Sequence, residues 1–143
     1  MHVECFRSDP VIRVGVLISS GDGMSGASMT SMLANAAAMA VEDINNDSSL
    51  LDGSPLEVIF AETLCSAPAA LAALSKLLEE GPLAAVIGPG CSVACEATGF
   101  LTAGRDLPQI SYSCLSPALT DKDAYPTVTC DACLLALLGA WIA

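Results

Sequence analysis

The stretch PLAAVIGPGCSVACEATGFLTAGRDLPQISY, residues 82–112, predicts a strand, a glycine turn, a helix and a second strand. Residues 83–87 form a short, uninterrupted apolar run, which is typical of a strand buried on both faces. Gly88, Pro89 and Gly90 break that run, because proline cannot sit in a central ladder and glycine permits a tight turn. The resulting β-α-β unit presents its loops at the carboxyl ends of its strands, where α/β folds bind ligands.

The rest of the chain extends this alternation of strands and helices. Residues 11–18, 56–61, 83–87 and 107–112 are predicted as strands, and residues 27–46, 66–80 and 91–103 as helices. Ser66 is expected to cap the second helix, and residues 123–129 to be extended at a sheet edge or in a loop. The apolar helix positions from which the buried faces are predicted are Met29, Met32, Leu33, Ala36, Ala37, Ala40, Val41, Ile44, Leu71, Leu74, Leu77, Leu78, Val93, Ala97, Phe100 and Leu101.

This order of elements predicts the fold class. Alternating strands and helices require a parallel sheet with right-handed crossovers and helices on both faces. We therefore expect a three-layer α/β/α lobe with a mostly parallel, flavodoxin-like sheet whose first strand lies in the middle. Residues 11–129 are assigned to this lobe, since 143 residues are enough for one domain with a core.

Charge and cysteine content limit the possible partners. The net charge of −11 argues against nucleic acid and against an anionic membrane surface, because both require a basic face. Seven cysteines with a single histidine, His2, do not supply a zinc site, so we expect no metal. An oxidising compartment explains the cysteines better. The first ten residues are not a signal peptide, so either the start is missing, which we favour, or the cysteines are reduced.

Catalysis is not supported by the residues. Serines follow the third and fourth predicted strands, but His2 precedes the fold and cannot act as their base. The Ser/Gly-rich loop at 19–28 fits neither a P-loop nor a dinucleotide pattern, which favours a plain surface loop. We expect no catalytic residue and no cofactor.

The final segment, residues 130–143, is interpreted as a divergent apolar tail. Residues 134–143 are apolar throughout, but their length is about half of the ~20 residues needed to span a bilayer. The segment resembles the start of a buried helix whose partner is not in the chain, and a cut or altered carboxyl terminus is the simplest explanation. We expect it to expose an apolar surface through which the chain associates.

Several stretches resemble the extracellular ligand-binding domain of receptor guanylate cyclases, a group that includes the natriuretic peptide receptors. They are IRVGVLI at 12–18, AAAMAVEDIN at 36–45, AVIGPGCSVACEATGFLTAGRDLPQISY at 85–112 and CLSPALTDKDAYPT at 114–127. The wider class is the type I periplasmic-binding fold, which metabotropic glutamate and GABA-B receptors share. Where the family usually has an arginine after YPT-x-T, this chain has Cys130, and the resemblance ends there.

The resemblance implies a truncated version of that fold, namely the amino-terminal half of the first of two hinged lobes. The implied function is a non-catalytic ligand-binding lobe of a single-pass membrane receptor guanylate cyclase. It would lie on the extracellular face of the plasma membrane and bind a peptide to regulate cGMP signalling. The second lobe, the transmembrane helix and the cyclase domain of that family are absent from this chain. The alternative is a small-molecule, amino-acid-like sensor lobe of the same class.

The resemblance also implies a homodimer of the full receptor, formed through the first lobe. The predicted surface combines the helices at 66–80 and 91–103. Their alanines and threonines would allow another helix to approach closely. The residues considered are Ala69, Ala70, Ala72, Ala73, Ala94, Thr98 and Thr102.

Candidate site residues gather at the carboxyl edge of the predicted sheet. Cys65 and Cys91 both follow strand ends there, so a bridge is geometrically possible among other pairings, and the resembling receptors have a disulfide at the matching positions. Gly90 and Cys91 place backbone N–H groups at a helix start, where an anion, a water molecule or the Ser92 hydroxyl could accept their hydrogen bonds. The resemblance implies that the acceptor is a chloride and that Thr63 supplies a further hydroxyl donor. The predicted cleft residues are Ser92, Ser111, Tyr112 and Ser113.

Overall fold

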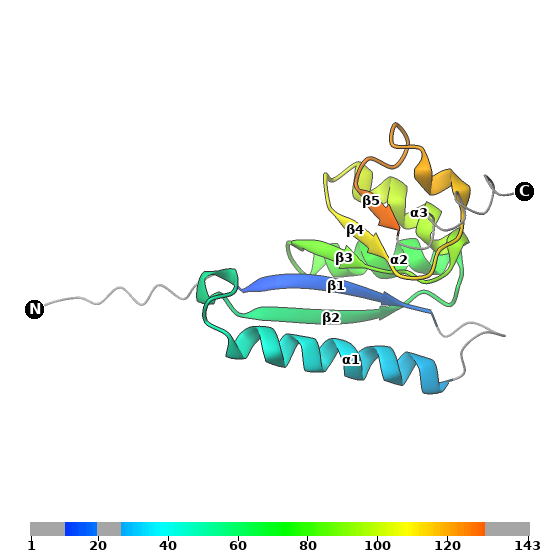
Figure 1. Cartoon of the computed structure of the whole chain (residues 1–143). Coiled ribbons are helices and arrows are strands. Elements are labelled where there is room, and N and C mark those ends of the chain that lie inside the picture. Colours follow the sequence, from blue (N-terminus) through cyan, green and yellow to red (C-terminus); the bar gives the residue numbers. More distant parts are fainter. Residues whose placement is uncertain (1–10, 20–26, 131–143) are drawn as a thin grey trace, which may run out of the picture.

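The computed structural model describes residues 11–19 and 27–130. Strands and helices alternate along this part of the chain, with two short 3-10 turns (Figure 1). The elements are β1 (Ile12–Ile18), α1 (Ala27–Asn46), η1 (Leu51–Gly53), β2 (Leu56–Glu62), α2 (Ala67–Glu79), β3 (Ala85–Ile87), α3 (Ser92–Ala103), β4 (Gln109–Ser111), η2 (Pro117–Thr120) and β5 (Val128–Cys130).

All strand pairs in the sheet are parallel, and the strand order is β2-β1-β3-β4-β5. This is the flavodoxin-like order with the first strand inside the sheet, as the sequence predicted. β1 pairs with β2 over its whole length, from Ile12 opposite Leu56 to Ile18 opposite Glu62. β1 also pairs with β3, with Val16 opposite Ile87. β2 and β3 lie on opposite sides of β1, so the chain crosses over to one side after β1 and to the other side after β2. The carboxyl ends of β1 and β3 therefore flank the topological switch point.

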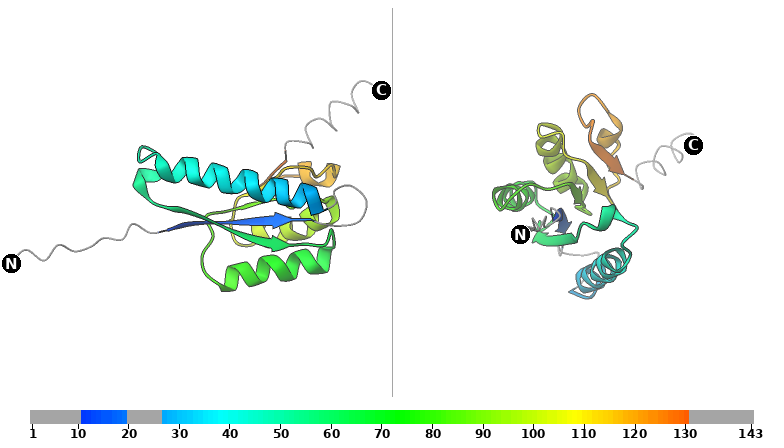
Figure 2. Two further views of the ribbon diagram at one scale, coloured as in Figure 1. Left: turned by 90° about the horizontal axis from the view of Figure 1, so that it is seen from below. Right: turned by 90° about the vertical axis from the view of Figure 1, so that its left-hand side faces the viewer.

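Helices cover both faces of the sheet, which confirms the three-layer prediction. α2 and α3 lie side by side on one face, and α1 lies on the other face beneath β1 and β2 (Figures 1 and 2). The core between the sheet and α2 is fully apolar. Its buried members are Leu17, Leu74, Leu77, Val86 and Leu107.

Apolar spacing predicted the inward Leu74 and Leu77 of α2 correctly, but it did not predict the buried side of α3. In α3, Val93 is 51% exposed and Phe100 is 60% exposed. The buried side of α3 carries small and polar residues instead: Ala94, Cys95, Thr98, Gly99 and Thr102. The cause lies in the facing strand, because Gln109 of β4 supplies hydrogen-bond partners that make a polar helix face the better fit.

Two further helix predictions need correction. Leu71 of α2 and Met32 of α1 were expected to face inward, and both are exposed, as are Ala36 and Ala40. Ser66 occupies the N-cap position of α2, but its side chain makes no capping hydrogen bond. α1 covers only β1 and β2, so a narrower stripe of the helix is enough to make that contact.

The strand bounds also differ from the prediction. β3 and β4 have three residues each, shorter than the apolar runs at 83–87 and 107–112. The segment predicted to be extended at 123–129 is extended only from Val128, where β5 begins and pairs with β4 at the sheet edge. The residues before it form turns, because the Asp121 carboxylate accepts from the N–H groups of Asp123 and Ala124. The loop at 20–26 and the tail at 131–143 lie outside the described residues, so the predictions made for them stay predictions.

Candidate functional site

The turn after β3 is the centre of the carboxyl edge of the sheet. The Gly88–Pro89 peptide bond is cis, and Gly88 has a φ of 91°, a value that residues with a side chain rarely adopt. A Cβ on Gly88 would overlap the Leu17 carbonyl oxygen at the end of β1. The Gly88 N–H donates to the Ile110 carbonyl oxygen of β4 at 2.7 Å. Glycine at position 88 is therefore required for the turn to sit between β1 and β4.

Tyr112, at the end of β4, packs on this turn. A Cβ on Gly90 would lie 2.8 Å from Cε2 of the Tyr112 ring, so the small residue makes room for the ring. The Tyr112 hydroxyl donates to the Leu17 carbonyl oxygen at 3.4 Å. Burial raises the pKa of the Tyr112 phenol above its ordinary value. Tyr112 thus closes over the glycine turn as a neutral side chain.

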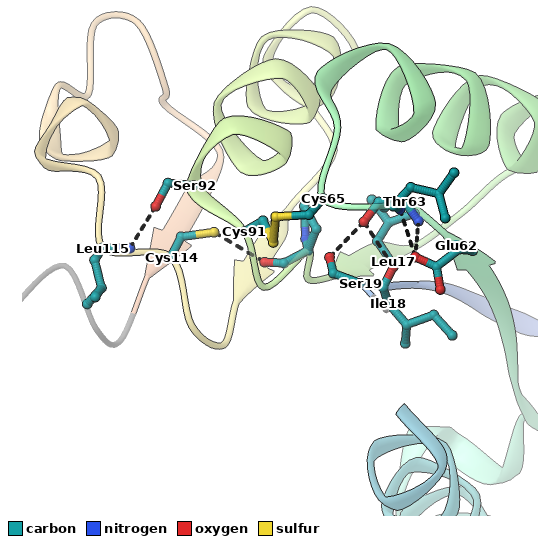
Figure 3. The surroundings of a disulfide bond; sticks show 12 residues. Leu17, Ile18, Ser19, Glu62, Thr63, Cys65, Cys91, Ser92, Cys114 and Leu115 are labelled. Atoms are coloured by element: carbon teal, nitrogen blue, oxygen red, sulfur yellow. Dashed lines mark hydrogen bonds between the residues drawn. A yellow bond between two sulfur atoms is a disulfide. The ribbon is translucent and has the colours of Figure 1, made fainter. Parts of the chain in front are cut away.

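A disulfide joins Cys65 to Cys91 beside this turn, which confirms the predicted pairing (Figure 3). The two Cα atoms are 5.4 Å apart, within the usual range for a bridge. Cys65 lies in the loop between β2 and α2, and Cys91 occupies the N-cap position of α3. The bridge therefore fixes the starts of α2 and α3 relative to each other at the edge where the candidate site lies.

The loop after β2 is held by two side chains, Glu62 and Thr63 (Figure 3). The Glu62 Oε1 atom accepts hydrogen bonds from the N–H groups of Thr63 at 2.9 Å and Leu64 at 2.7 Å. The buried Thr63 hydroxyl donates to the Ile18 carbonyl oxygen at 2.9 Å and lies 2.7 Å from the Ser19 hydroxyl. The Thr63 hydroxyl is thus already engaged inside the protein, with a carboxylate next to it.

The predicted chloride site was assigned to Gly90, Cys91 and Thr63. Gly90 and Cys91 stand directly before α3, as expected, and Cys91 is also part of the disulfide. The Thr63 hydroxyl donates to the Ile18 carbonyl oxygen, so its proton is not available to an anion. A chloride at this helix start stays a prediction, with Gly90 and Cys91 as its principal donors.

The other predicted cleft residues differ in their accessibility. Ser111 is fully buried, and its hydroxyl donates to the Pro89 carbonyl oxygen and accepts from the Cys114 N–H, both at 3.2 Å. The Ser92 hydroxyl accepts from the Leu115 N–H at 3.1 Å (Figure 3). Ser113 is exposed. Ser92 and Ser111 therefore shape the edge, and Ser113 is the predicted cleft serine most open to solvent.

A buried polar network behind the edge was missed by the sequence reasoning. The Gln109 side-chain nitrogen donates to the Thr98 hydroxyl at 3.0 Å, and the Thr102 hydroxyl donates to the Gln109 side-chain oxygen at 3.1 Å. All three side chains are fully buried. A glutamine in an apolar strand and two threonines four residues apart on a helix are the signals that could have revealed it. The network fixes how α3 sits on β4.

A groove of about 540 Å³ lies elsewhere, between the edge strand β2 and α2. Its lining includes Phe60, Ala69, Ala72, Lys76 and Glu80. None of the predicted cleft residues lines it, and it runs along the side of the lobe.

Within residues 11–19 and 27–130, no group of three or more histidine, cysteine, aspartate or glutamate residues could hold a metal ion. In the same part of the chain, no helix is long and apolar enough to cross a membrane.

The described residues have an α/β fold like that of the type I periplasmic-binding proteins. The structure superimposes on LivJ, a branched-chain amino-acid binding protein from Streptococcus pneumoniae that was solved with isoleucine. The TM-score is 0.71 at 22% sequence identity, and the match covers 85% of this chain and 33% of LivJ. At this identity the likeness concerns the fold alone.

Sequence comparison then identifies the family. Residues 32–134 match the family model described as the receptor family ligand binding region, and the chain belongs to this family. The chain is 32% identical over 123 residues to the Resact receptor of Arbacia punctulata, covering 85% of this chain and 12% of that receptor. It is 34% identical over 79 residues to Guanylate cyclase D of Mus musculus, covering 55% of this chain and 7% of that protein. The chain thus spans a small part of the length of these curated relatives.

Proposed function

We propose that this chain is the first ligand-binding lobe of a cell-surface receptor guanylate cyclase. In this proposal an extracellular peptide binds at the carboxyl edge of the sheet and regulates cGMP synthesis by a domain outside the chain. The single observation that carries the proposal is the match to the receptor family ligand binding region over residues 32–134. The likeness to Guanylate cyclase D supports the type of receptor.

The geometry of the edge supports binding rather than catalysis. The polar side chains there are engaged in holding the turns, as in the hydrogen bonds of Ser92 and Ser111. No histidine is available to activate a serine in the described part of the chain, because the protein's single histidine is His2. We propose that the lobe itself is non-catalytic and that its edge contributes one side of a ligand cleft.

The peptide ligand is tested against its main competitor, a free amino acid. The amino-acid alternative is supported by the fold likeness to LivJ, which was solved with isoleucine. The full extracellular region is screened with a phage-displayed peptide library and, separately, with each of the twenty free amino acids. Enriched peptides that raise cGMP in cells expressing the full receptor would support the proposal. A free amino acid that stabilises the protein against heat, with no enriched peptide, would contradict it.

We also propose a homodimer of the full receptor through α2 and α3, on revised residues. Four of the residues predicted for that surface are fully buried within the lobe and cannot form it, namely Ala70, Ala94, Thr98 and Thr102. The large apolar side chains exposed on these helices are Leu71, Val93 and Phe100. The Phe100 ring also packs on the Tyr125 ring at a centroid distance of 4.7 Å. Exposed apolar residues on neighbouring helices are what an interface would bury.

The dimer is tested by placing a charge on that surface. Leu71→Arg and Val93→Arg are made in the full extracellular region, with Ser48→Arg as a control at an exposed turn. A charge in a symmetric contact faces its own copy, so both variants should sediment as monomers while the control stays dimeric. An unchanged dimer in both variants would place the contact elsewhere.

A further inference from the structure

Two buried thiols meet behind the candidate site. Cys95 lies in the first turn of α3, and Cys114 lies in the loop that follows β4. Both are present as reduced thiols with no exposed surface. They share one buried cluster with Leu119, Tyr125 and Val128, and their side chains hydrogen-bond to each other. A pair of thiols in contact needs little movement to form a bridge.

The surroundings hold each sulfur in place. The Cys95 sulfur accepts from the Gln109 side-chain nitrogen at 3.4 Å. The Cys114 N–H donates to the Ser111 hydroxyl, and its thiol donates to the Pro89 carbonyl oxygen, both at 3.2 Å. These partners come from β4 and from the turn after β3. The two cysteines are therefore brought together by the same contacts that build the edge of the sheet.

Burial determines when these thiols can react. The hydrogen bond to Cys95, together with burial, raises the pKa of the Cys114 thiol well above its ordinary value. The thiolate is the reactive form, and it is disfavoured at Cys114, whereas the hydrogen bond with Cys114 lowers the pKa of the Cys95 thiol. Because neither sulfur has an exposed surface, the folded lobe excludes an oxidant from both. Oxidation would therefore take place while the chain folds or opens.

We propose that Cys95 and Cys114 form a second disulfide in the secreted protein, tying α3 to the loop between β4 and β5. The proposal rests on the extracellular placement given in the proposed function. One cysteine thiolate attacks an oxidant that carries a disulfide, such as oxidised glutathione, and releases one thiol. The second cysteine thiolate then displaces the other thiol from the mixed disulfide. Two electrons and two protons pass from the protein to the oxidant.

The second bridge would change how the edge is held. Bonding Cys114 to Cys95 removes the thiol donor from the Pro89 carbonyl oxygen, while the Ser111 hydroxyl still donates to it. Cys91 and Cys95 are one helical turn apart, so α3 would be anchored through its first turn at two points. One anchor leads to the loop after β2, and the other leads to the loop after β4.

The test uses the full chain as secreted from cells, with Cys65–Cys91 as an internal reference. Free thiols are alkylated at once in denaturant, because Cys95 and Cys114 are buried. Peptides are mapped without reduction, both directly and after reduction and refolding in glutathione buffers of increasing oxidising power. We expect the Cys95 and Cys114 peptides to be joined. The mass of the joined pair should be two hydrogens lower than the summed masses of the two unalkylated thiol peptides. We also expect unfolding at a temperature roughly 10 °C higher than for Cys114→Ser, which keeps a hydroxyl donor but cannot bridge.

The outcomes separate this proposal from the proposed function. If Cys65–Cys91 is bridged and both Cys95 and Cys114 are alkylated at every glutathione ratio, the second bridge is wrong and the extracellular placement stands. If all four are alkylated in freshly secreted protein, the placement is contradicted. In that case a Cys95–Cys114 disulfide found in the oxidising buffers would still support the second bridge. If the two cysteines stay unjoined in those buffers, the second bridge is overturned.

Discussion

The two faces of the sheet are covered to different extents. On one face α2 and α3 form a complete layer, and Leu17 and Val86 beneath it have no exposed surface. On the other face α1 lies over β1 and β2, and in the described part of the chain no helix lies over β3 and β4 (Figure 2). There, Ile87 is 37% exposed and Ile110 is 46% exposed.

The register of the strands shows that the exposed residues lie in one row with the buried Val16. Val16 of β1 is opposite Phe60 of β2 and Ile87 of β3, and Ile87 is opposite Ile110 of β4. Residues opposite each other in a parallel sheet point to the same face. Parallel strands are normally buried on both faces, so this apolar row calls for a further covering element. The comparison teaches that the lobe is complete on the face that α2 and α3 cover and incomplete over β3 and β4 on the opposite face.

The largest stability effect is expected at the covered face, where the disulfide joins the starts of α2 and α3. Replacing Cys65 and Cys91 together by alanine should lower the free energy of unfolding by roughly 3–4 kcal/mol, because the unfolded chain regains the entropy of an open loop. Urea unfolding of the double variant against the oxidised parent measures this. A loss below about 1 kcal/mol would mean that the covered face does not depend on the bridge.

Neighbouring residues of β3 compare the two faces directly. Val86→Thr places a hydroxyl in the core under α2 and should cost about 2 kcal/mol of unfolding free energy, since that hydroxyl would be buried. Ile87→Thr is the matched control on the open face and should cost less than about 1 kcal/mol. In the full extracellular region the cost of Ile87→Thr should rise if another element covers this row. Equal costs for the two variants in this chain would remove the distinction between the faces.

A smaller effect is expected from the polar network between α3 and β4. Thr98→Val removes the acceptor for the Gln109 side-chain nitrogen and should lower the free energy of unfolding by about 1–2 kcal/mol. Thr129→Val, at an exposed position of β5, serves as the control and should change little. If Thr98→Val is as stable as its parent, the network does not hold the helix in place.

The smallest effect on unfolding is expected from the apolar tail, whose influence is on association. Deleting residues 131–143 leaves β5 intact and should make the isolated chain more monodisperse, since the apolar run at 134–143 is removed. Light scattering before and after the deletion measures this. A clean monomer with the tail present would contradict the expectation of tail-driven association.

The sequence predicted the arrangement of elements better than it predicted their packing. Alternating apolar runs were enough to predict a parallel sheet with β1 inside, because few topologies obey the crossover rules. The Cys65–Cys91 pairing followed from resemblance, since spacing alone leaves several pairings open.

The buried side of α3 could not be predicted from its own residues. Val93 and Phe100 looked like the core face by apolar spacing, yet Thr98 and Thr102 are buried. Their partner Gln109 comes from the next strand, so the preference is set by a tertiary contact. The same limit applies at the candidate site. Ser111 ends β4 at the carboxyl edge, but its hydroxyl is hydrogen-bonded to the Pro89 carbonyl oxygen and the Cys114 N–H.

The central claim is that the carboxyl edge of this lobe contacts an extracellular peptide, and one matched pair of variants tests it. Ser113→Arg enlarges an exposed residue at that edge, and Ser48→Arg makes the same change at the exposed turn after α1. Binding of a library-derived peptide to the full extracellular region is measured by calorimetry for both. The account predicts that affinity falls by roughly tenfold or more for Ser113→Arg and is unchanged for Ser48→Arg. Equal affinity in both variants would contradict it.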